Sequence, residues 1–195
     1  MRLFIAIHPP EALLRQLEQT QQELKQRLPW PNFRWTGPGQ MHLTLRFLGQ
    51  LPEAELDPVL RATELAACQS SSAELEATGL ACFPSVRRPR VLWAGLSGQL
   101  DLLEKLYQAI NEQTRAWGEP DPRPFHPHFT LARIKDVRPV QVLALRALLE
   151  QYAAFRPGSW RACSVELMES ELTAQGPQYR CRGSFALRSG WSSPD

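Results

Sequence analysis

The chain is 195 residues long, and hydrophobic residues make up 43% of it while charged residues make up 22%. This balance is typical of a folded soluble protein, and no apolar run approaches the ~20 residues that a transmembrane helix needs. Disordered, collagen-like and membrane-spanning classes are therefore excluded. The formal net charge is +2, from 22 basic and 20 acidic residues. That charge excludes a strongly basic nucleic-acid coat but is compatible with a local basic site.

Hydrophobic periodicity and the positions of proline and glycine predict alternating strands and helices. In chain order these are a strand at 2–7, a helix at 11–28, a Pro/Gly loop at 32–40, a strand at 41–49, a helix at 53–69, strands at 74–83 and 91–96, a helix at 100–117, a strand at 128–134, a helix at 139–152, and strands at about 160–170 and 178–188.

The N-terminal segment and the cysteines bear on the cellular compartment of the protein. The apolar run at 3–7 is too short for a signal peptide. The four cysteines have no C-x-x-C spacing, which favours free buried thiols in a cytoplasmic protein over disulfides or a zinc site. They are Cys68, Cys82, Cys163 and Cys181.

One pattern occurs twice. His-Leu-Thr-Leu at 42–45 and His-Phe-Thr-Leu at 128–131 lie 86 residues apart, and each is followed by a helix and two strands. This repeat predicts an α+β protein with two pseudo-twofold related lobes of about 90–100 residues. A ligand cleft is expected on the axis between the lobes.

The repeated residues carry the chemistry. Residues i and i+2 of a strand point to one face, so His42 shares a face with Thr44, and His128 with Thr130. Near neutral pH one imidazole can accept a proton while the other donates one. The two hydroxyls can donate hydrogen bonds to a developing oxyanion. This set fits attack by water or a sugar hydroxyl on a phosphodiester, without a side-chain nucleophile and without a metal.

The segments 42–49 (His-Leu-Thr-Leu-Arg-Phe-Leu-Gly) and 127–133 (Pro-His-Phe-Thr-Leu-Ala-Arg) resemble the two HxTx motifs of the two-histidine (2H) phosphoesterases. The chain is most similar to their RNA 2′,3′-cyclic phosphodiesterases, also called 2′-5′ RNA ligases. The similarity extends to 3–7, 34–35 and 89–95, and thus covers essentially the whole chain.

The resemblance implies one domain over residues 1–195, made of two intertwined lobes, each with an antiparallel sheet flanked by helices. It implies hydrolysis of the 2′,3′-cyclic phosphate at an RNA end, tRNA fragments included, to a 2′-phosphate. It further implies that no metal, ATP or other cofactor takes part and that 2′-5′ linkages can be formed or cleaved. His42 would be the proton donor and His128 the proton acceptor, while Thr44, Thr130 and Arg133 would bind phosphate. A cytoplasmic monomer that does not associate with membranes is expected.

Strand parity places Arg133 on the face opposite to His128, so that it reaches the phosphate only across a twist or bulge. His126 is expected to be a bystander at the rim of the site, and His8 a solvated strand end.

Contacts to RNA beyond the phosphate are expected from the loops. Arg90 lies in a basic segment that also holds Arg87 and Arg88, and with Arg123 these arginines are candidates for tracking the RNA backbone. Phe125 and Trp35 are candidates for stacking on a terminal base, although both rings also suit core packing.

Two other functions fit part of the pattern. His126 and His128 would make a pair of zinc ligands with Asp121 as a third, a site that leaves His42 and Thr44 without a role. An RNA-end binding module would keep the basic loop without turnover, but it does not explain why both histidines and both threonines are present.

Overall fold

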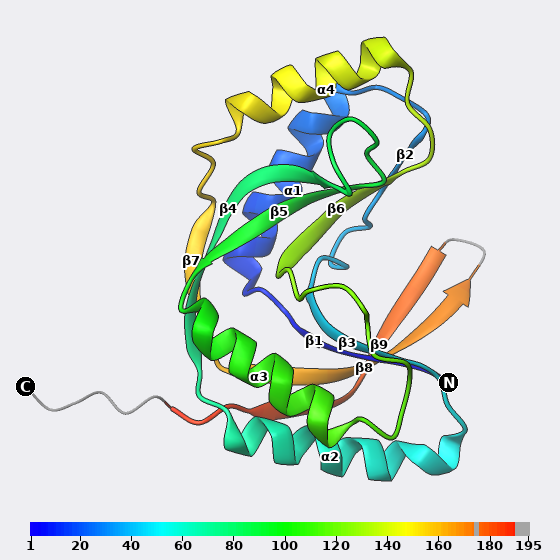
Figure 1. The fold of residues 1–195 in the computed structure, drawn as a ribbon, viewed down its shortest axis with the longest axis vertical. Helices are drawn as coiled ribbons and strands as arrows, with labels where there is room; N and C mark the ends of the chain where they lie inside the picture. Colours follow the sequence, from blue (N-terminus) through cyan, green and yellow to red (C-terminus); the bar gives the residue numbers. More distant parts are fainter. Residues whose placement is uncertain (174–175, 190–195) are drawn as a thin grey trace, which may run out of the picture.

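In the computed structural model, which describes residues 1–173 and 176–189, the chain forms nine strands and four α-helices (Figure 1). The strands are β1 (Arg2–Ile7), β2 (Phe33–Trp35), β3 (Leu43–Gln50), β4 (Ala73–Phe83), β5 (Val91–Gly98), β6 (His128–Ile134), β7 (Gly158–Ala162), β8 (Ser164–Thr173) and β9 (Gly176–Ala186). The helices are α1 (Glu11–Arg27), α2 (Leu56–Gln69), preceded by the short 3-10 helix η1 (Glu53–Glu55), α3 (Leu100–Gln113) and α4 (Pro139–Gln151).

The strands make one antiparallel sheet in the order β7-β4-β5-β6-β3-β1-β8-β9, with β2 paired to the far part of β6. We call β7, β4, β5, β6 and β2 the β6 half, and β3, β1, β8 and β9 the β3 half. The pairing between the halves consists of Leu43 on β3 opposite Phe129 on β6. The predicted α+β class with an antiparallel sheet in each half is confirmed, and this narrow connection joins the two sheets into one.

The two halves exchange strands along the sequence. The β4–β5 hairpin follows β3 in the chain but lies in the β6 half, and the β8–β9 hairpin follows β6 but lies in the β3 half. Each half of the sheet is therefore built from both halves of the sequence.

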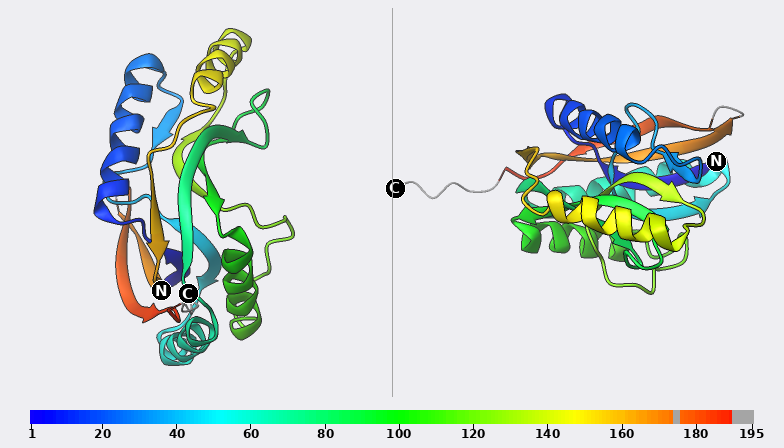
Figure 2. Two further views of the ribbon diagram at one scale, coloured as in Figure 1. Left: turned by 90° about the vertical axis from the view of Figure 1, so that its left-hand side faces the viewer. Right: turned by 90° about the horizontal axis from the view of Figure 1, so that it is seen from above.

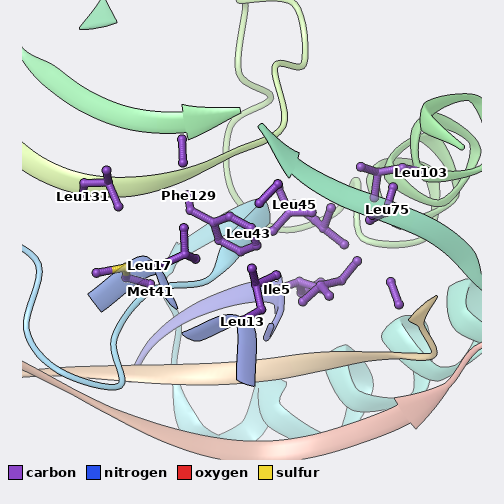
Figure 3. Close-up of a cluster of buried hydrophobic side chains, with 14 of the residues drawn as sticks. Ile5, Leu13, Leu17, Met41, Leu43, Leu45, Leu75, Leu103, Phe129 and Leu131 are labelled. Carbon is purple, nitrogen blue, oxygen red and sulfur yellow. The ribbon is translucent and has the colours of Figure 1, made fainter. Parts of the chain in front are cut away.

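Three of the four helices follow the same division (Figures 1 and 2). Helix α1 contacts β7 and α4 contacts β4, both in the β6 half, whereas α2 contacts β8 and β9 in the β3 half. Helix α3 packs on α2 and contacts both β3 and β4. Apolar residues at helical spacing explain the packing of α1, whose Leu13, Leu17 and Leu24 are buried. The core formed in this way fills the space behind the junction of the two halves, where Leu43 and Phe129 lie beside one another (Figure 3).

Every predicted helix and strand is present, with ends shifted by a few residues, but three local predictions were wrong. The loop at 32–40 contains β2, and the strand predicted at 160–170 is two strands interrupted at Cys163. The four cysteines are free, as expected, but only Cys82 is buried. Among the described residues, no helix has both the length and the apolar character needed to cross a membrane.

Candidate active site

The two histidines flank the junction of the sheet. His42 immediately precedes β3, and His128 is the first residue of β6. Because β3 and β6 are antiparallel about the Leu43–Phe129 pair, His42 falls on the side of Thr130, and Thr44 on the side of His128. The sheet connection thus brings together the two motifs that sequence analysis singled out.

Contacts with neighbouring strands show which way these side chains point. Phe4 stacks on His42, and Thr44 is paired with Ala6, which lies on the same face of β1 as Phe4. In the β6 half, Thr130 is paired with Trp93, whose ring lies 6.0 Å from that of His128. We call the surface carrying His42, Thr44, His128 and Thr130 the histidine face.

Each histidine is oriented by a backbone carbonyl two residues before it. Nδ1 of His42 lies 2.9 Å from the carbonyl oxygen of Gln40, and Nδ1 of His128 lies 2.7 Å from that of His126. A carbonyl oxygen can only accept a hydrogen bond, so Nδ1 carries the hydrogen in both rings. Nε2 is then the nitrogen that can take up or release a proton during a reaction.

Aromatic rings surround both imidazoles, a feature that sequence reasoning missed. The His42 ring packs against Phe4, at a centroid distance of 4.9 Å, and against Tyr179, at 5.3 Å, and these two rings also contact each other. The His128 ring lies 5.0 Å from Phe83 and beside Trp93. These neighbours come from strands distant in the sequence, so only the strand pairing could have revealed them.

Burial among these rings changes the acidity of the histidines. It lowers the pKa of His42 from its usual 6.5 to about 4, against the opposing effect of the Gln40 carbonyl. The charges of His8, His128 and Arg133 lower the pKa of His42 further. Burial likewise lowers the pKa of His128. The two rings therefore lie close enough to influence each other, and both are neutral near pH 7.

A bulge in β6 corrects the expectation that Arg133 lies on the wrong face. Against β5, Trp93 pairs with Thr130 and Leu92 with Ala132, so that Leu131 is an extra residue. Beyond the bulge the alternation is shifted by one residue, and Arg133 points to the same side as Thr130. Its charge accordingly acts on both histidines.

The other motif strand has the matching bulge. Against β1, Ala6 pairs with Thr44 and Ile5 with Arg46, so that Leu45 is the extra residue. Phe47 then takes the position in the β3 half that Arg133 has in the β6 half. The Phe47 side chain is 56% exposed, unusual for so large an apolar residue. Its place three residues after Thr44, as Arg133 stands after Thr130, is the signal by which it could have been found.

His8 is not the solvated strand end that was expected. Its Nδ1 lies 2.7 Å from Oε2 of Glu166 on β8, and the two side chains are 26% and 23% exposed. The His8 ring also lies 5.7 Å from the ring of His42. His126, by contrast, is exposed at the rim as expected, against Phe83 and Trp93.

Each of the three candidate RNA contacts also interacts with other residues of the protein. Arg90 forms an ion pair with Asp136 and also donates to the carbonyl of Lys135. Phe125 stacks on Tyr107 of α3 with ring centroids 4.1 Å apart. Trp35 packs against Phe33, with the Lys25 ammonium 5.8 Å from its ring.

The donors proposed for a zinc site do not converge. Both carboxylate oxygens of Asp121 accept hydrogen bonds from Arg123. Within residues 1–173 and 176–189, no group of three His, Cys, Asp or Glu side chains is arranged to hold a metal ion.

Two cavities of the structure lie away from the histidine face. One of about 470 Å³ lies beside the start of β1 and the end of β8, and one of about 390 Å³ lies beside the start of α4. Neither cavity is lined by a histidine. The predicted cleft between the lobes corresponds to neither of them.

The chain is similar in sequence and fold to known proteins. The chain is 36% identical over 140 residues, 71% of its length and 77% of the relative's, to an RNA 2′,3′-cyclic phosphodiesterase of Aeropyrum pernix. A Thermus thermophilus protein of the same name is 32% identical over 96% of this chain and 91% of its own. The crystal structure of the Thermus thermophilus protein TT0787 superposes with a TM-score of 0.75 at 30% identity, covering 98% of this chain and 100% of that one. The model of the LigT-like phosphoesterases matches residues 7–93 and 96–179. The chain therefore belongs to the LigT-like phosphoesterase family.

Proposed function

We propose that this protein hydrolyses the 2′,3′-cyclic phosphate at the end of an RNA strand to a 2′-phosphomonoester. The observation that carries the proposal is the pair of imidazoles on one face, each held through Nδ1 so that Nε2 is left for the substrate. The names of the relatives from Aeropyrum pernix and Thermus thermophilus support the same reaction.

In the proposed mechanism, Nε2 of His128 takes a proton from water as the water oxygen attacks phosphorus. The bond between phosphorus and the ribose 3′ oxygen breaks, and Nε2 of His42 gives its proton to that oxygen. Thr44 and Thr130 donate hydrogen bonds to the non-bridging oxygens, whose negative charge grows in the transition state and is stabilised by Arg133. The two histidines exchange protonation states in one turnover and return to the starting state through solvent.

The low pKa of His42 fits this role once substrate is bound. A proton donor must carry a proton, and in the free protein His42 carries one only below about pH 4. A phosphodiester anion next to the ring favours the charged imidazolium and raises the pKa of His42. Substrate binding thus favours protonation of His42, which then transfers this proton to the leaving oxygen.

Several finer features complete the proposal. The exposed ring of Phe47 offers a stacking surface for the terminal base. A 5′ hydroxyl that attacks in place of water gives a 2′-5′ bond without ATP, because the same 3′ oxygen leaves. The protein acts as a monomeric domain of two intertwined lobes in the cytoplasm, on RNA ends such as those of tRNA fragments, and it needs no metal.

The experiment uses a nucleoside 2′,3′-cyclic phosphate in excess chelator, with the wild-type protein and the His42→Ala and His128→Ala variants. We expect wild-type turnover to a 2′-phosphate and a loss of about 100-fold or more in each variant, because each removes one proton-transfer group. Circular dichroism checks that the variants are folded. Full activity in either variant, or loss of wild-type activity on chelation, contradicts the mechanism. Tight binding without turnover would identify an RNA-end binding module instead.

A further inference from the structure

Arg34 lies beside the proposed phosphate ligand Arg133. In the antiparallel pair of β2 and β6, Arg34 is directly opposite Arg133. Residues opposite each other in such a pair project on the same face with Cβ atoms about 4.5–5.5 Å apart. Arg34 therefore continues the histidine face beyond Arg133, and both side chains are exposed.

This arrangement costs stability in the free protein. Like charges directly opposite each other on a sheet repel. Within the described part of the chain, neither arginine forms an ion pair with an acidic side chain, whereas Arg15, Arg123 and Arg161 do. Phosphate anions bound by the two guanidinium groups would relieve the repulsion, and phosphate suits the forked donors of each.

The position of Arg34 also defines where such an anion would lie. Nη2 of Arg34 lies 3.9 Å from the point where a Cβ would project from Gly176, the first residue of β9 in the opposite half. Gln40 also contacts the start of β9, because its Nε2 donates a hydrogen bond to the carbonyl oxygen of Pro177 at 2.7 Å. The ring of Tyr179, three residues or roughly 10 Å further along β9, contacts His42. Arg34 therefore lies at the boundary between the halves, beside the first residue of the strand that carries Tyr179.

The charges around Tyr179 agree with this placement. Burial raises the pKa of Tyr179, whereas the charges of Arg133, Arg2 and Arg34 act to lower it. Three guanidinium groups from three different strands thus act on a single ring beside His42.

We propose that Arg34 binds the phosphodiester that links the terminal nucleotide of the RNA to its 5′ neighbour, while Arg133 serves the cyclic phosphate. The inference rests on the proposed function and makes it more specific: the preferred substrate is an RNA strand rather than a mononucleotide. A cyclic mononucleotide offers Arg34 no second phosphate, whereas an oligonucleotide does.

The test compares a nucleoside 2′,3′-cyclic phosphate with a short oligoribonucleotide that ends in the same group. The proteins are the wild type, Arg34→Ala, Arg34→Lys and the control Arg61→Ala, which removes an exposed charge from α2. We expect Arg34→Ala to lower kcat/KM about tenfold more for the oligonucleotide than for the mononucleotide, the size of one charge-assisted contact. Arg34→Lys should recover part of that loss, and Arg61→Ala should leave kcat/KM unchanged for both substrates.

Salt dependence and binding give independent readouts. The logarithm of the binding constant for the oligonucleotide falls linearly with the logarithm of the salt concentration. In Arg34→Ala this line should be less steep, by the amount expected for the loss of about one phosphate contact. Equal effects of Arg34→Ala on both substrates, or no oligonucleotide preference in the wild type, would overturn the inference but leave the proposed function intact. If the wild type hydrolyses neither substrate, the proposed function fails. Anisotropy with a labelled oligonucleotide ending in a 2′-phosphate then still decides on Arg34, since equal binding by wild type and Arg34→Ala excludes the contact.

Discussion

Leu43 lies opposite Phe129 where the two halves of the sheet meet, and each stands between the histidine and the threonine of its own motif. Both side chains are buried, at 1% and 0% exposure, so the apolar side of this pair anchors the junction in the core. The spacing between the two catalytic candidates therefore depends on a packing contact on the opposite face of the strands.

Replacement of Phe129 by alanine should affect both stability and activity. We expect the free energy of unfolding to fall by about 3–5 kcal/mol, as for other buried phenylalanines, and kcat to fall because the motifs are no longer held in register. Urea unfolding and initial rates measure the two effects. The control is Leu145→Ala, a fully buried leucine of α4, which should lose stability with little effect on kcat. A folded Phe129→Ala protein with normal kcat would contradict the structural role of the junction.

The pH dependence of the reaction should reflect the lowered pKa values of His42 and His128. Catalysis requires one proton on the pair, so activity is lost when a second proton binds at low pH and when the last proton leaves at higher pH. Since the pKa of His42 is about 4 and that of His128 is also lowered, we expect kcat/KM to peak between about pH 4 and 6.5. The profile of kcat should peak at higher pH, because bound phosphate raises both pKa values. A kcat/KM optimum above pH 7 would contradict these shifts.

His8 should make His42 more acidic. A positive charge on His8 repels a proton on the neighbouring ring. His8→Gln is therefore expected to raise the pKa of His42 and to shift the acidic limb of the kcat/KM profile to higher pH. Titration of the histidine Cε1–H signals by NMR measures this directly. The matched control is His126→Gln, which should raise the pKa of His128 but not that of His42. Identical His42 titrations in wild type and His8→Gln would rule out the coupling.

Gly95 leaves room for the Trp93 ring, which lies beside His128. It lies opposite His128 in the β5–β6 pair, and a Cβ at this position would come within 3.2 Å of Cζ3 of Trp93 and of the Thr78 carbonyl oxygen. Gly95→Ala should therefore displace the indole and lower kcat roughly tenfold, with a loss of about 1 kcal/mol in stability.

The second variant, Gly95→Ala with Trp93→Phe, tests the reason for that loss. The smaller ring removes the contact with the new methyl group and should restore part of the rate. No change of kcat in Gly95→Ala, measured under saturating substrate, would mean that the position of Trp93 does not matter to His128.

The sequence was sufficient to predict the helices, most strands and the four residues of the histidine face, because period-2 alternation and the repeat are local signals. The bulges at Leu45 and Leu131 could not be deduced, since a bulge is defined by the partner strand. In the structure each bulge appears as two adjacent buried residues, Leu45 with Arg46 and Leu131 with Ala132. For the same reason the setting of His8 was mistaken: its partner Glu166 belongs to a strand near the other end of the chain, and strand pairing over that distance leaves no local pattern.

The place of β1 between β3 and β8 has a consequence for biosynthesis. The strand that carries Phe4 beneath His42 comes well before one of its two neighbours, residues 164–173, in the chain, and it is therefore synthesised before that neighbour. Until then β1 has an open edge that could pair with other chains, a known aggregation hazard. The contacts between β1 and β8 therefore form only after both motifs have been synthesised, so a truncated chain that ends before β8 would carry both motifs and yet leave one edge of β1 unpaired.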